Sequence, residues 1–413
     1  MRIAIIGGGL SGLVSAYRLS PDHEITIYEK SAELGGLLSS YHRGTYSIER
    51  YYHHFFTGDE SFLHLLDELR LTEDILWLKG STGTYLNGVI YPLTTPIEIL
   101  RYPYLTIPDK IKLGLFTKKV RTFDLSELDA ISAEKFLHEQ VGDKIYQSFF
   151  RPLLKSKFGM NAEKVSAAWL VSRVAIRSDR SLAGERLGYL NKGFSRFINT
   201  ISGQITERGG EIRISSPVTS LIRQEKTWFV NDEPYEGIIA TIAPGLLREI
   251  GVPISDVPYQ GAACLTMGLK RAVTNGIYWI NLYDNAPYGA VIGHTCFAPF
   301  SWYGEHIIYL ASYFTGNPVP DLKEQMIRDF CKKFGVQKSD ILWTELSLDP
   351  FAGPLYLAGY KPRMEELTVP GMSLAGMFSA ENYPERSIEG SVRAGERAAK
   401  EIISFSQLEG RPL

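Results

Sequence analysis

The residues with the clearest chemical meaning are three glycines and one acid near the N-terminus. The glycines lie in the run Gly7-Gly8-Gly9-Leu10-Ser11-Gly12, between an apolar segment and a segment with helical spacing. The first glycine permits a tight turn, the second lets the backbone approach a pyrophosphate, and the third lets a helix pack closely on a strand. Glu29 follows 22 residues after Gly7, where a carboxylate accepts hydrogen bonds from a ribose hydroxyl. The sequence therefore predicts a dinucleotide site with contacts from Gly7, Gly9, Leu10, Ser11, Gly12 and Glu29.

Two further glycine-containing segments narrow the choice of dinucleotide. Glu33-Leu34-Gly35-Gly36-Leu37 follows the second apolar segment, and Leu374-Ala375-Gly376-Met377 precedes Arg386-Ser387-Ile388-Glu389-Gly390 near the C-terminus. These segments resemble the superfamily of FAD-containing amine oxidases and protoporphyrinogen oxidases. A helix beginning near Ile388 would also present unpaired N–H groups and a positive dipole end. Next to a flavin, both would favour electron density at the N1/O2 edge.

The resemblance implies non-covalent FAD, because the closing segment contains no cysteine. It extends to residues 48–55, with Tyr51 where the family has a glycine, and Leu37 replaces the family's usual arginine. It also implies that Val218 lies against the adenine. The further cofactor contacts that it implies are Lys30, Gly35, Gly36, Leu37, Leu38, Gly376, Met377, Ile388, Glu389 and Gly390.

The hydrophobic patterns predict an α/β chain with a Rossmann-like, glutathione-reductase-like FAD-binding domain and a second α+β substrate domain. Short apolar runs predict strands at residues 2–6, 24–28, 211–214, 218–222, 237–241 and 372–376. Helical spacing occurs at 11–19, 61–71, 132–141, 144–155, 166–176, 194–208 and 388–405. We therefore expect a discontinuous FAD-binding domain made of residues 1–75, 205–250 and 365–413. Residues 76–204 and 251–364 would form the substrate domain.

Candidate catalytic and substrate-binding residues are histidines, a tyrosine and two arginines. His53 and His54 follow Tyr52 in an aromatic stretch, and a histidine beside a flavin can donate a hydrogen bond to it or exchange a proton near neutral pH. A structural role for these histidines is an open alternative. Arg173 and Arg177 share one face of a predicted helix and would clamp an anionic substrate. An exposed or ion-paired helix face is the plainer alternative for the arginines.

Composition limits the class of protein. The 413 residues are 44% hydrophobic and carry a net charge of −2, which argues against nucleic-acid binding through a basic face. Three widely spaced cysteines without a CxxC pair indicate neither a disulfide framework nor a zinc site, and predict a cytoplasmic protein without a metal. No segment has the length of a membrane span, but the mixed basic and apolar residues 107–121 leave a peripheral membrane contact open.

The sequence thus predicts an FAD-dependent oxidoreductase that moves hydride from an unidentified small-molecule substrate to flavin N5. A second GxGxxG after a strand is absent, so we expect reoxidation by oxygen, a quinone or a partner protein. One alternative is a flavin-dependent sugar-nucleotide mutase that resembles UDP-galactopyranose mutase. Another is a non-catalytic binding protein with the same nucleotide fold, which the intact glycine fingerprint disfavours.

Overall fold

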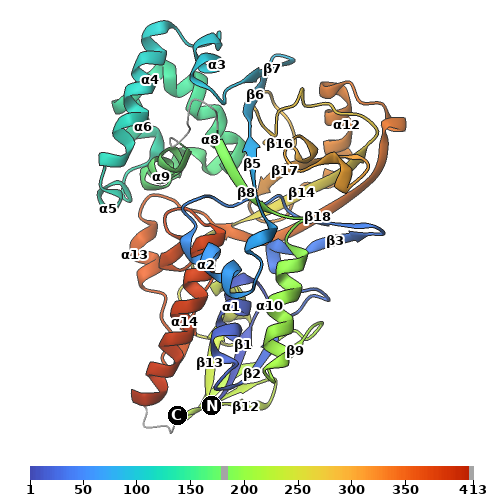
Figure 1. Cartoon of the computed structure of the whole chain (residues 1–413). Coiled ribbons are helices and arrows are strands. Elements are labelled where there is room, and N and C mark those ends of the chain that lie inside the picture. The colour runs from blue at the N-terminus through green and yellow to red at the C-terminus, as the bar shows by residue number, and fades with distance from the viewer. Residues whose placement is uncertain (178–184, 409–413) are drawn as a thin grey trace.

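A parallel sheet lies in the lower half of the molecule in Figure 1. The structure is a computed structural model that describes residues 1–177 and 185–408. The strand order of the parallel sheet is β19-β13-β1-β2-β9, and every neighbouring pair is parallel. The strands are β19 (Met372–Leu374), β13 (Gly237–Ala240), β1 (Arg2–Ile6), β2 (Glu24–Tyr28) and β9 (Glu211–Arg213). Parallel neighbours require long crossover connections, so segments far apart in the chain lie side by side here.

Three helices pack on this sheet, a fourth packs on one of these helices, and two of them approach each other very closely. They are α1 (Leu10–Leu19), α2 (Glu60–Glu68), α10 (Ser195–Glu207) and α14 (Ile388–Leu408). A Cβ on Gly395 of α14 would lie 2.6 Å from the Ser11 carbonyl oxygen of α1, so only glycine permits this packing. Ser15 donates a 2.9 Å hydrogen bond to the Gly395 carbonyl. The C-terminal helix therefore holds the first helix in place beside the glycine loop.

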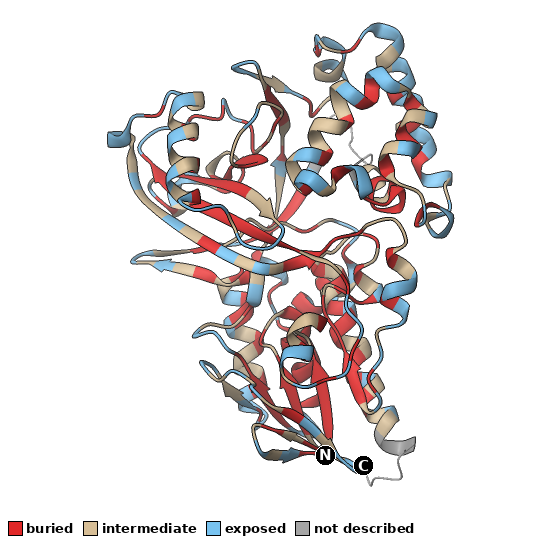
Figure 2. Cartoon of the chain, turned by 180° about the vertical axis from the view of Figure 1, so that it is seen from behind, coloured by how far each residue is buried: buried red, intermediate tan, exposed pale blue. Residues whose placement is uncertain are grey.

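A seven-stranded mixed sheet forms a second layer, with the order β18-β14-β17-β16-β15-β6-β7. These strands are β6 (Thr82–Leu86), β7 (Val89–Pro92), β14 (Tyr259–Leu269), β15 (Trp279–Leu282), β16 (Ala290–Gly293), β17 (His306–Phe314) and β18 (Ile341–Pro354). Helix α12 (Leu322–Phe334) packs on its outer face through Met326 and Phe330. Figure 2 shows buried residues concentrated along this sheet and the parallel one.

A group of helices completes the upper part of Figure 1. It contains α3 (Pro96–Arg101), α4 (Ile107–Lys119), α5 (Leu125–Leu128), α6 (Ala133–Val141), α7 (Asp143–Ile145), α8 (Arg151–Phe158) and α9 (Ala167–Arg177). The helix predicted for 144–155 is confirmed, and the structure adds a π-helical turn at Tyr146–Phe150 between α7 and α8. Pro152 has no N–H to donate within the helical run, and a π turn accommodates the missing bond.

Smaller elements connect these layers. They are the two-stranded pairs β3 (Ser40–Arg43) with β4 (Tyr46–Glu49) and β5 (Ile75–Gly80) with β8 (Glu185–Leu190), the three strands β10 (Leu221–Gln224), β11 (Thr227–Val230) and β12 (Glu233–Tyr235), and helices α11 (Pro244–Glu249) and α13 (Tyr360–Glu365). The strand predicted for 218–222 begins only at Leu221. The Asn231 side chain accepts the N–H groups of Thr219 and Ser220, so these residues cannot join a ladder.

The predicted α/β class with a Rossmann-like sheet is confirmed, as is a second part built on a mixed sheet. The parallel sheet takes its strands from residues 2–28, 211–240 and 372–374. The predicted domain boundaries stay a prediction, since the strands fix the members of the sheet and not the edges of an independently folding unit.

Candidate functional site

One cavity of about 1310 Å³ lies where the parallel sheet, the mixed sheet and the helical group meet. Pockets for single small ligands have volumes of roughly 300–1,000 Å³. The cavity is therefore large enough for a dinucleotide together with a second molecule. Its lining reaches from the glycine loop before α1 to residues of α4, α8, α9, β14 and β18.

The glycine loop forms one end of this cavity. Gly7, Gly9, Leu10 and Ser11 line it, and Gly9 is the N-cap of α1 without any side-chain cap or acid in the first turn. A Cβ added to Gly9 would meet no atom within 4 Å, whereas one on Gly12 would lie 2.1 Å from the Gly7 carbonyl oxygen. Gly9 is thus open toward a ligand, and Gly12, which is outside the lining, serves the packing of α1.

The Glu29 carboxylate is held beside this loop by the backbone. It accepts the N–H groups of Gly8 and Ser31, both at 2.8 Å, and both Glu29 and Lys30 line the cavity. A carboxylate has about four lone-pair sites, so capacity for ribose hydroxyls is left. This geometry fits the predicted role of Glu29 in a nucleotide site.

The glycine pair after β2 lies directly on the first glycine loop. Gly35 and Gly36 have φ angles of +102° and +56°, which favour glycine, and the Gly35 N–H donates to the Gly8 carbonyl at 2.9 Å. Both glycines line the cavity together with Leu37 and Leu38. The two glycine loops therefore build one wall of backbone.

The C-terminal segment meets the cavity through some of its predicted residues only. Gly376, Met377 and Ile388 line it. Glu389 and Gly390 are outside the lining. The Glu389 carboxylate accepts the N–H groups at the start of α2, from Ser61 at 3.2 Å and Phe62 at 2.9 Å, so its side chain caps a helix.

Gly390 and Val218 pack against other parts of the protein and do not line the cavity. A Cβ on Gly390 would lie 2.4 Å from Oδ1 of Asn382, which leaves room for no larger residue. Val218 lies in the loop between β9 and β10, outside the cavity lining, and packs against the buried cluster that contains Tyr28 and Leu221. Because Val218 is outside the cavity lining, the cavity does not support the predicted contact between Val218 and adenine.

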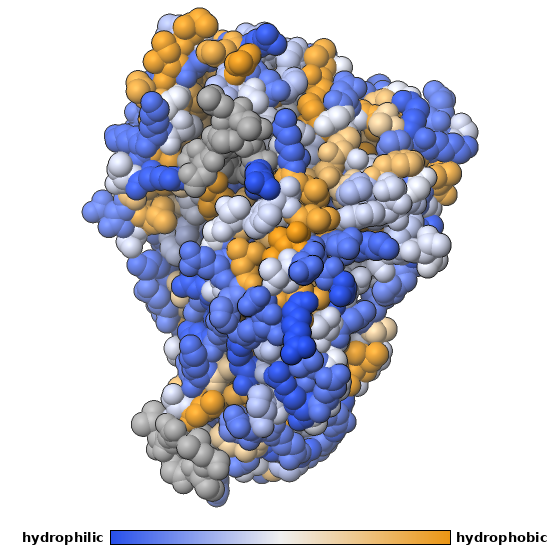
Figure 3. All heavy atoms as spheres, in the orientation of Figure 1, coloured by the Kyte–Doolittle hydropathy of each residue, from blue (hydrophilic) through white to orange (hydrophobic). Residues whose placement is uncertain are grey.

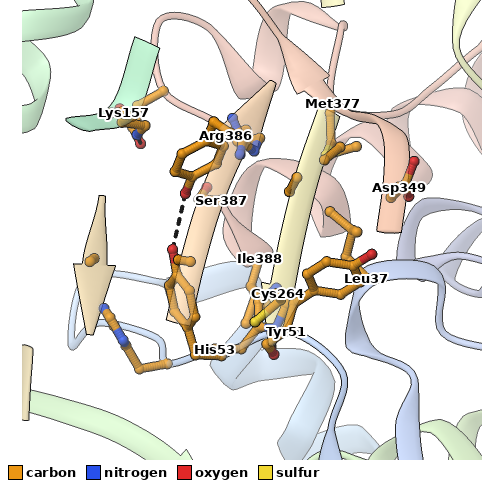
Figure 4. A pocket seen from close by; sticks show the side chains of 18 of the residues that line it. Leu37, Tyr51, His53, Lys157, Cys264, Asp349, Met377, Arg386, Ser387 and Ile388 are labelled. Carbon is orange, nitrogen blue, oxygen red and sulfur yellow. Dashed lines mark hydrogen bonds and ion pairs between the residues drawn. The ribbon is translucent and has the colours of Figure 1, made fainter. Parts of the chain in front are cut away.

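Aromatic residues and two histidines form a wall farther along the cavity, and Figure 4 labels Tyr51 and His53 of this wall. The Tyr52 hydroxyl pairs with the Tyr313 hydroxyl at 3.0 Å. His53 donates from Nδ1 to the Tyr51 carbonyl at 2.8 Å, and burial lowers the pKa of His53 to about 4. Its ring is therefore neutral, with Nε2 left as an acceptor. His54 also lines the cavity, with Nδ1 at 3.1 Å from the Tyr278 hydroxyl.

A charged cluster at the same cavity was only partly predicted. Arg173 lines the cavity, with its guanidinium 3.6 Å from Oε1 of Glu385, and Lys157 approaches the same oxygen at 3.3 Å. Arg386 lies next in sequence and also lines the cavity. The side chain of Arg177, the last residue of α9, lies outside the described part of the chain.

No local spacing pointed to Lys157, Glu385 and Arg386. Residues 157 and 385 are 228 positions apart, and only the packing of α8 near the C-terminal segment joins them.

Among the described residues, no group of three or more His, Cys, Asp and Glu side chains is placed to hold a metal ion.

A Rossmann-like sheet with an open glycine cradle and a second, aromatic-walled compartment defines a class of two-part oxidoreductases that bind a dinucleotide. The chain matches the family of flavin containing amine oxidoreductases over residues 10–403, and it belongs to that family. Membership makes it a flavin-containing oxidoreductase, which rules against the non-catalytic alternative.

The individual proteins that the chain resembles share only a small part of its sequence. Coproporphyrinogen III oxidase of Staphylococcus aureus is 25% identical over 291 residues, which cover 58% of this chain and 60% of that protein. The chain thus spans less than two thirds of that relative. A protein of Exiguobacterium sp. 255-15, assigned as a protoporphyrinogen oxidase, has a similar structure, with a TM-score of 0.76 and 19% identity over 97% of this chain and 98% of that one. Reduced UDP-galactopyranose mutase has a TM-score of 0.75 and 16% identity over 98% of this chain and 94% of its own.

Proposed function

We propose that this chain binds FAD without a covalent bond and oxidises a small organic molecule held in the second part of the cavity. The observation that carries the proposal is the continuity of the cavity. A single space joins the open Gly9 cradle to the wall that contains Tyr52 and His53. A substrate against that wall would lie beside the isoalloxazine end of a dinucleotide held at the cradle.

The residues of the chain would hold FAD at both of its ends. The N–H groups at the head of α1 would face the pyrophosphate, Glu29 would accept from a ribose hydroxyl, and the N-terminus of α14 at Ile388 would face the ring. When bound, FAD supplies an acceptor at N5 for the hydride that leaves a carbon of the substrate. The substrate also loses a proton, and oxygen, a quinone or a partner protein takes up the two electrons.

His53 is the residue best placed to orient the substrate by accepting a hydrogen bond from it. Because its Nδ1 proton is used by the Tyr51 carbonyl, Nε2 carries a free lone pair at neutral pH. The aromatic walls around it exclude water and orient the substrate, and orientation accounts for much of the rate in such reactions. His54 and Tyr52 would position the substrate from the same stretch of chain.

The experiment begins with the colour of the purified protein. We expect a flavin spectrum, release of free FAD on denaturation, and anaerobic bleaching by an oxidisable substrate, with coproporphyrinogen III tested first because a relative acts on it. A protein that stays colourless after incubation with FAD would refute the proposal. The mutase alternative predicts instead that dithionite-reduced protein isomerises UDP-galactopyranose without net oxidation.

We further propose that the cavity opens toward a membrane surface. In the described residues, no helix is both long and apolar enough to span a bilayer. However, Ile107, Ile111 and Leu115 lie at four-residue intervals along α4 and are 58%, 59% and 63% exposed. Ile97 and Leu100 of α3 are exposed beside them. Figure 3 shows hydrophobic side chains gathered at this end of the molecule.

Charge and the cavity both favour a lipid surface as the partner of this face. Lys112, Lys118, Lys119 and Arg121 are exposed on or next to α4 and would contact anionic headgroups. Leu100 also lines the cavity, so an apolar substrate could pass from the bilayer into the site.

Vesicle flotation tests this contact. We expect the protein to float with phosphatidylglycerol vesicles and not with phosphatidylcholine vesicles, and Ile111→Glu to abolish flotation. Leu342→Glu is the matched control, because Leu342 is 49% exposed on β18. Equal flotation of both variants would refute the contact.

The predicted cytoplasmic location is a separate matter from this contact and stays a prediction. The three cysteines, Cys264, Cys296 and Cys331, are free thiols.

A further inference from the structure

One part of the cavity wall carries more positive charge than its own acid neutralises. Lys157 and Arg173 share a single oxygen of Glu385, Oε1, at 3.3 and 3.6 Å. Among the described residues, none forms a hydrogen bond or ion pair with Arg386, although its guanidinium lies within the wall. With Lys157 protonated, three cations and one carboxylate leave a formal charge of +2.

The position of Arg386 is built into the fold. A Cβ on Gly353 would lie 2.5 Å from one terminal nitrogen and 2.6 Å from the central carbon of the guanidinium. The guanidinium therefore lies against the bare backbone of β18, and any larger residue at Gly353 would displace it. In Figure 4, Arg386 and Lys157 lie in the upper left of the pocket and Asp349 lies on the right. Asp349 accepts the Phe351 N–H at 2.8 Å.

The surroundings of the cluster are aromatic. The Lys157 ammonium lies 4.5 Å from the centre of the Trp169 ring, and the Tyr52–Tyr313 hydroxyl pair belongs to the same cavity. A cation in such a poorly hydrated wall is costly unless an anion compensates it. A guanidinium presents a planar fork of donors that matches a carboxylate or phosphate.

We propose that Arg386, Lys157 and Arg173 bind the anionic group of the substrate, so that the substrate is an amphipathic organic anion. A carboxylate, sulfonate or phosphate would bind at the cluster, and the apolar body of the molecule would lie along Tyr52 and His53. This inference rests on the proposed oxidoreductase function and names the substrate class of that site. The family match does not specify it.

Two probes with the same skeleton test the proposal on the flavin-loaded protein. Anilinonaphthalene sulfonate carries one negative charge, and phenylnaphthylamine is its neutral counterpart. Binding is followed by the change in the visible flavin spectrum, which excludes probe that binds at the exposed face of α4. We expect the sulfonate to bind at least tenfold more tightly than the neutral probe.

Substitutions then locate the effect. Arg386→Met and Lys157→Met should each weaken the sulfonate at least tenfold and change the neutral probe less than twofold. Arg386→Lys, which keeps the charge without the fork, should give an intermediate loss. Lys270→Met is the control, because Lys270 is exposed and lies outside the cavity lining. It should leave both affinities unchanged.

The outcomes separate this inference from the proposed function. Flavin content reports on the function, and the preference between probes reports on the anion site. Equal binding of both probes to a flavin-loaded protein overturns the anion site alone. Loss of flavin from folded Arg386→Met would also overturn it, because the guanidinium would then hold the cofactor. The wild-type preference requires no substitution, so the test does not depend on how the variants fold.

Discussion

Replacing Gly9 with aspartate should abolish cofactor binding without unfolding the protein. Gly9 has φ −75° and ψ 179°, an extended conformation open to any residue, and a Cβ there meets no atom within 4 Å. The new carboxylate would face the pyrophosphate. At about 4 Å and an effective dielectric constant of about 20, each pair of like charges costs about 4 kcal/mol. That corresponds to roughly a thousandfold loss of affinity for FAD.

The assay is FAD titration of apoprotein, followed by flavin fluorescence, with the Tm of the apoprotein as a measure of folding. Gly9→Asn is the matched control, because it has the same shape without the charge. We expect a small loss of FAD affinity for asparagine and a roughly thousandfold loss for aspartate, with the two apoproteins equally stable. Equal losses would show that bulk and not charge matters, and full flavin content in Gly9→Asp would refute the placement of the pyrophosphate.

Three further predictions concern packing, capping and pH. Gly12→Ala should lower the free energy of unfolding by about 1–3 kcal/mol, measured with denaturant, because its Cβ would lie 2.1 Å from the Gly7 carbonyl oxygen; an unchanged midpoint would contradict this contact. Glu389→Ala should cost about 0.5–2 kcal/mol by uncapping α2 while flavin content stays normal, and loss of flavin would instead assign Glu389 to the cofactor. Burial, together with Arg173 and Arg386, lowers the pKa of Lys157 to about 7, and Glu385 opposes this shift. Affinity for the sulfonate probe should therefore fall as pH rises through about 7, since the ammonium loses its proton, and a flat profile would show that Lys157 does not bind the anion.

The anion site and the exposed face of α4 describe one kind of substrate from two directions. The face on α3 and α4 suits an apolar molecule that arrives from a lipid surface, and the cluster at Arg386 suits a charged end group. An amphipathic acid satisfies both. The two proposals are tested by different experiments, so either can fail without the other.

The sequence alone determined the parts of the site that depend on local spacing. The glycine run before α1, the acid at Glu29 and the pair Gly35-Gly36 each follow a strand within a few residues, so strand, turn and cradle are specified together. The glycine fingerprint predicted the correct fold class because a backbone that approaches phosphates requires glycine at fixed positions.

Tertiary structure decided how distant side chains converge and which of them are used for packing. Glu389 belongs to the motif that pointed to the cofactor, yet its carboxylate caps α2 by accepting the N–H of Ser61, which is 328 residues away in the sequence. Lys157 and Glu385 meet although 228 residues separate them. No sequence pattern encodes such pairs, because charge balance in a cavity depends on which helices pack around it. The sequence thus predicted the glycine loops that would hold the cofactor, and only the packing of α8, α9 and the C-terminal segment brought the cationic side chains together in the same cavity.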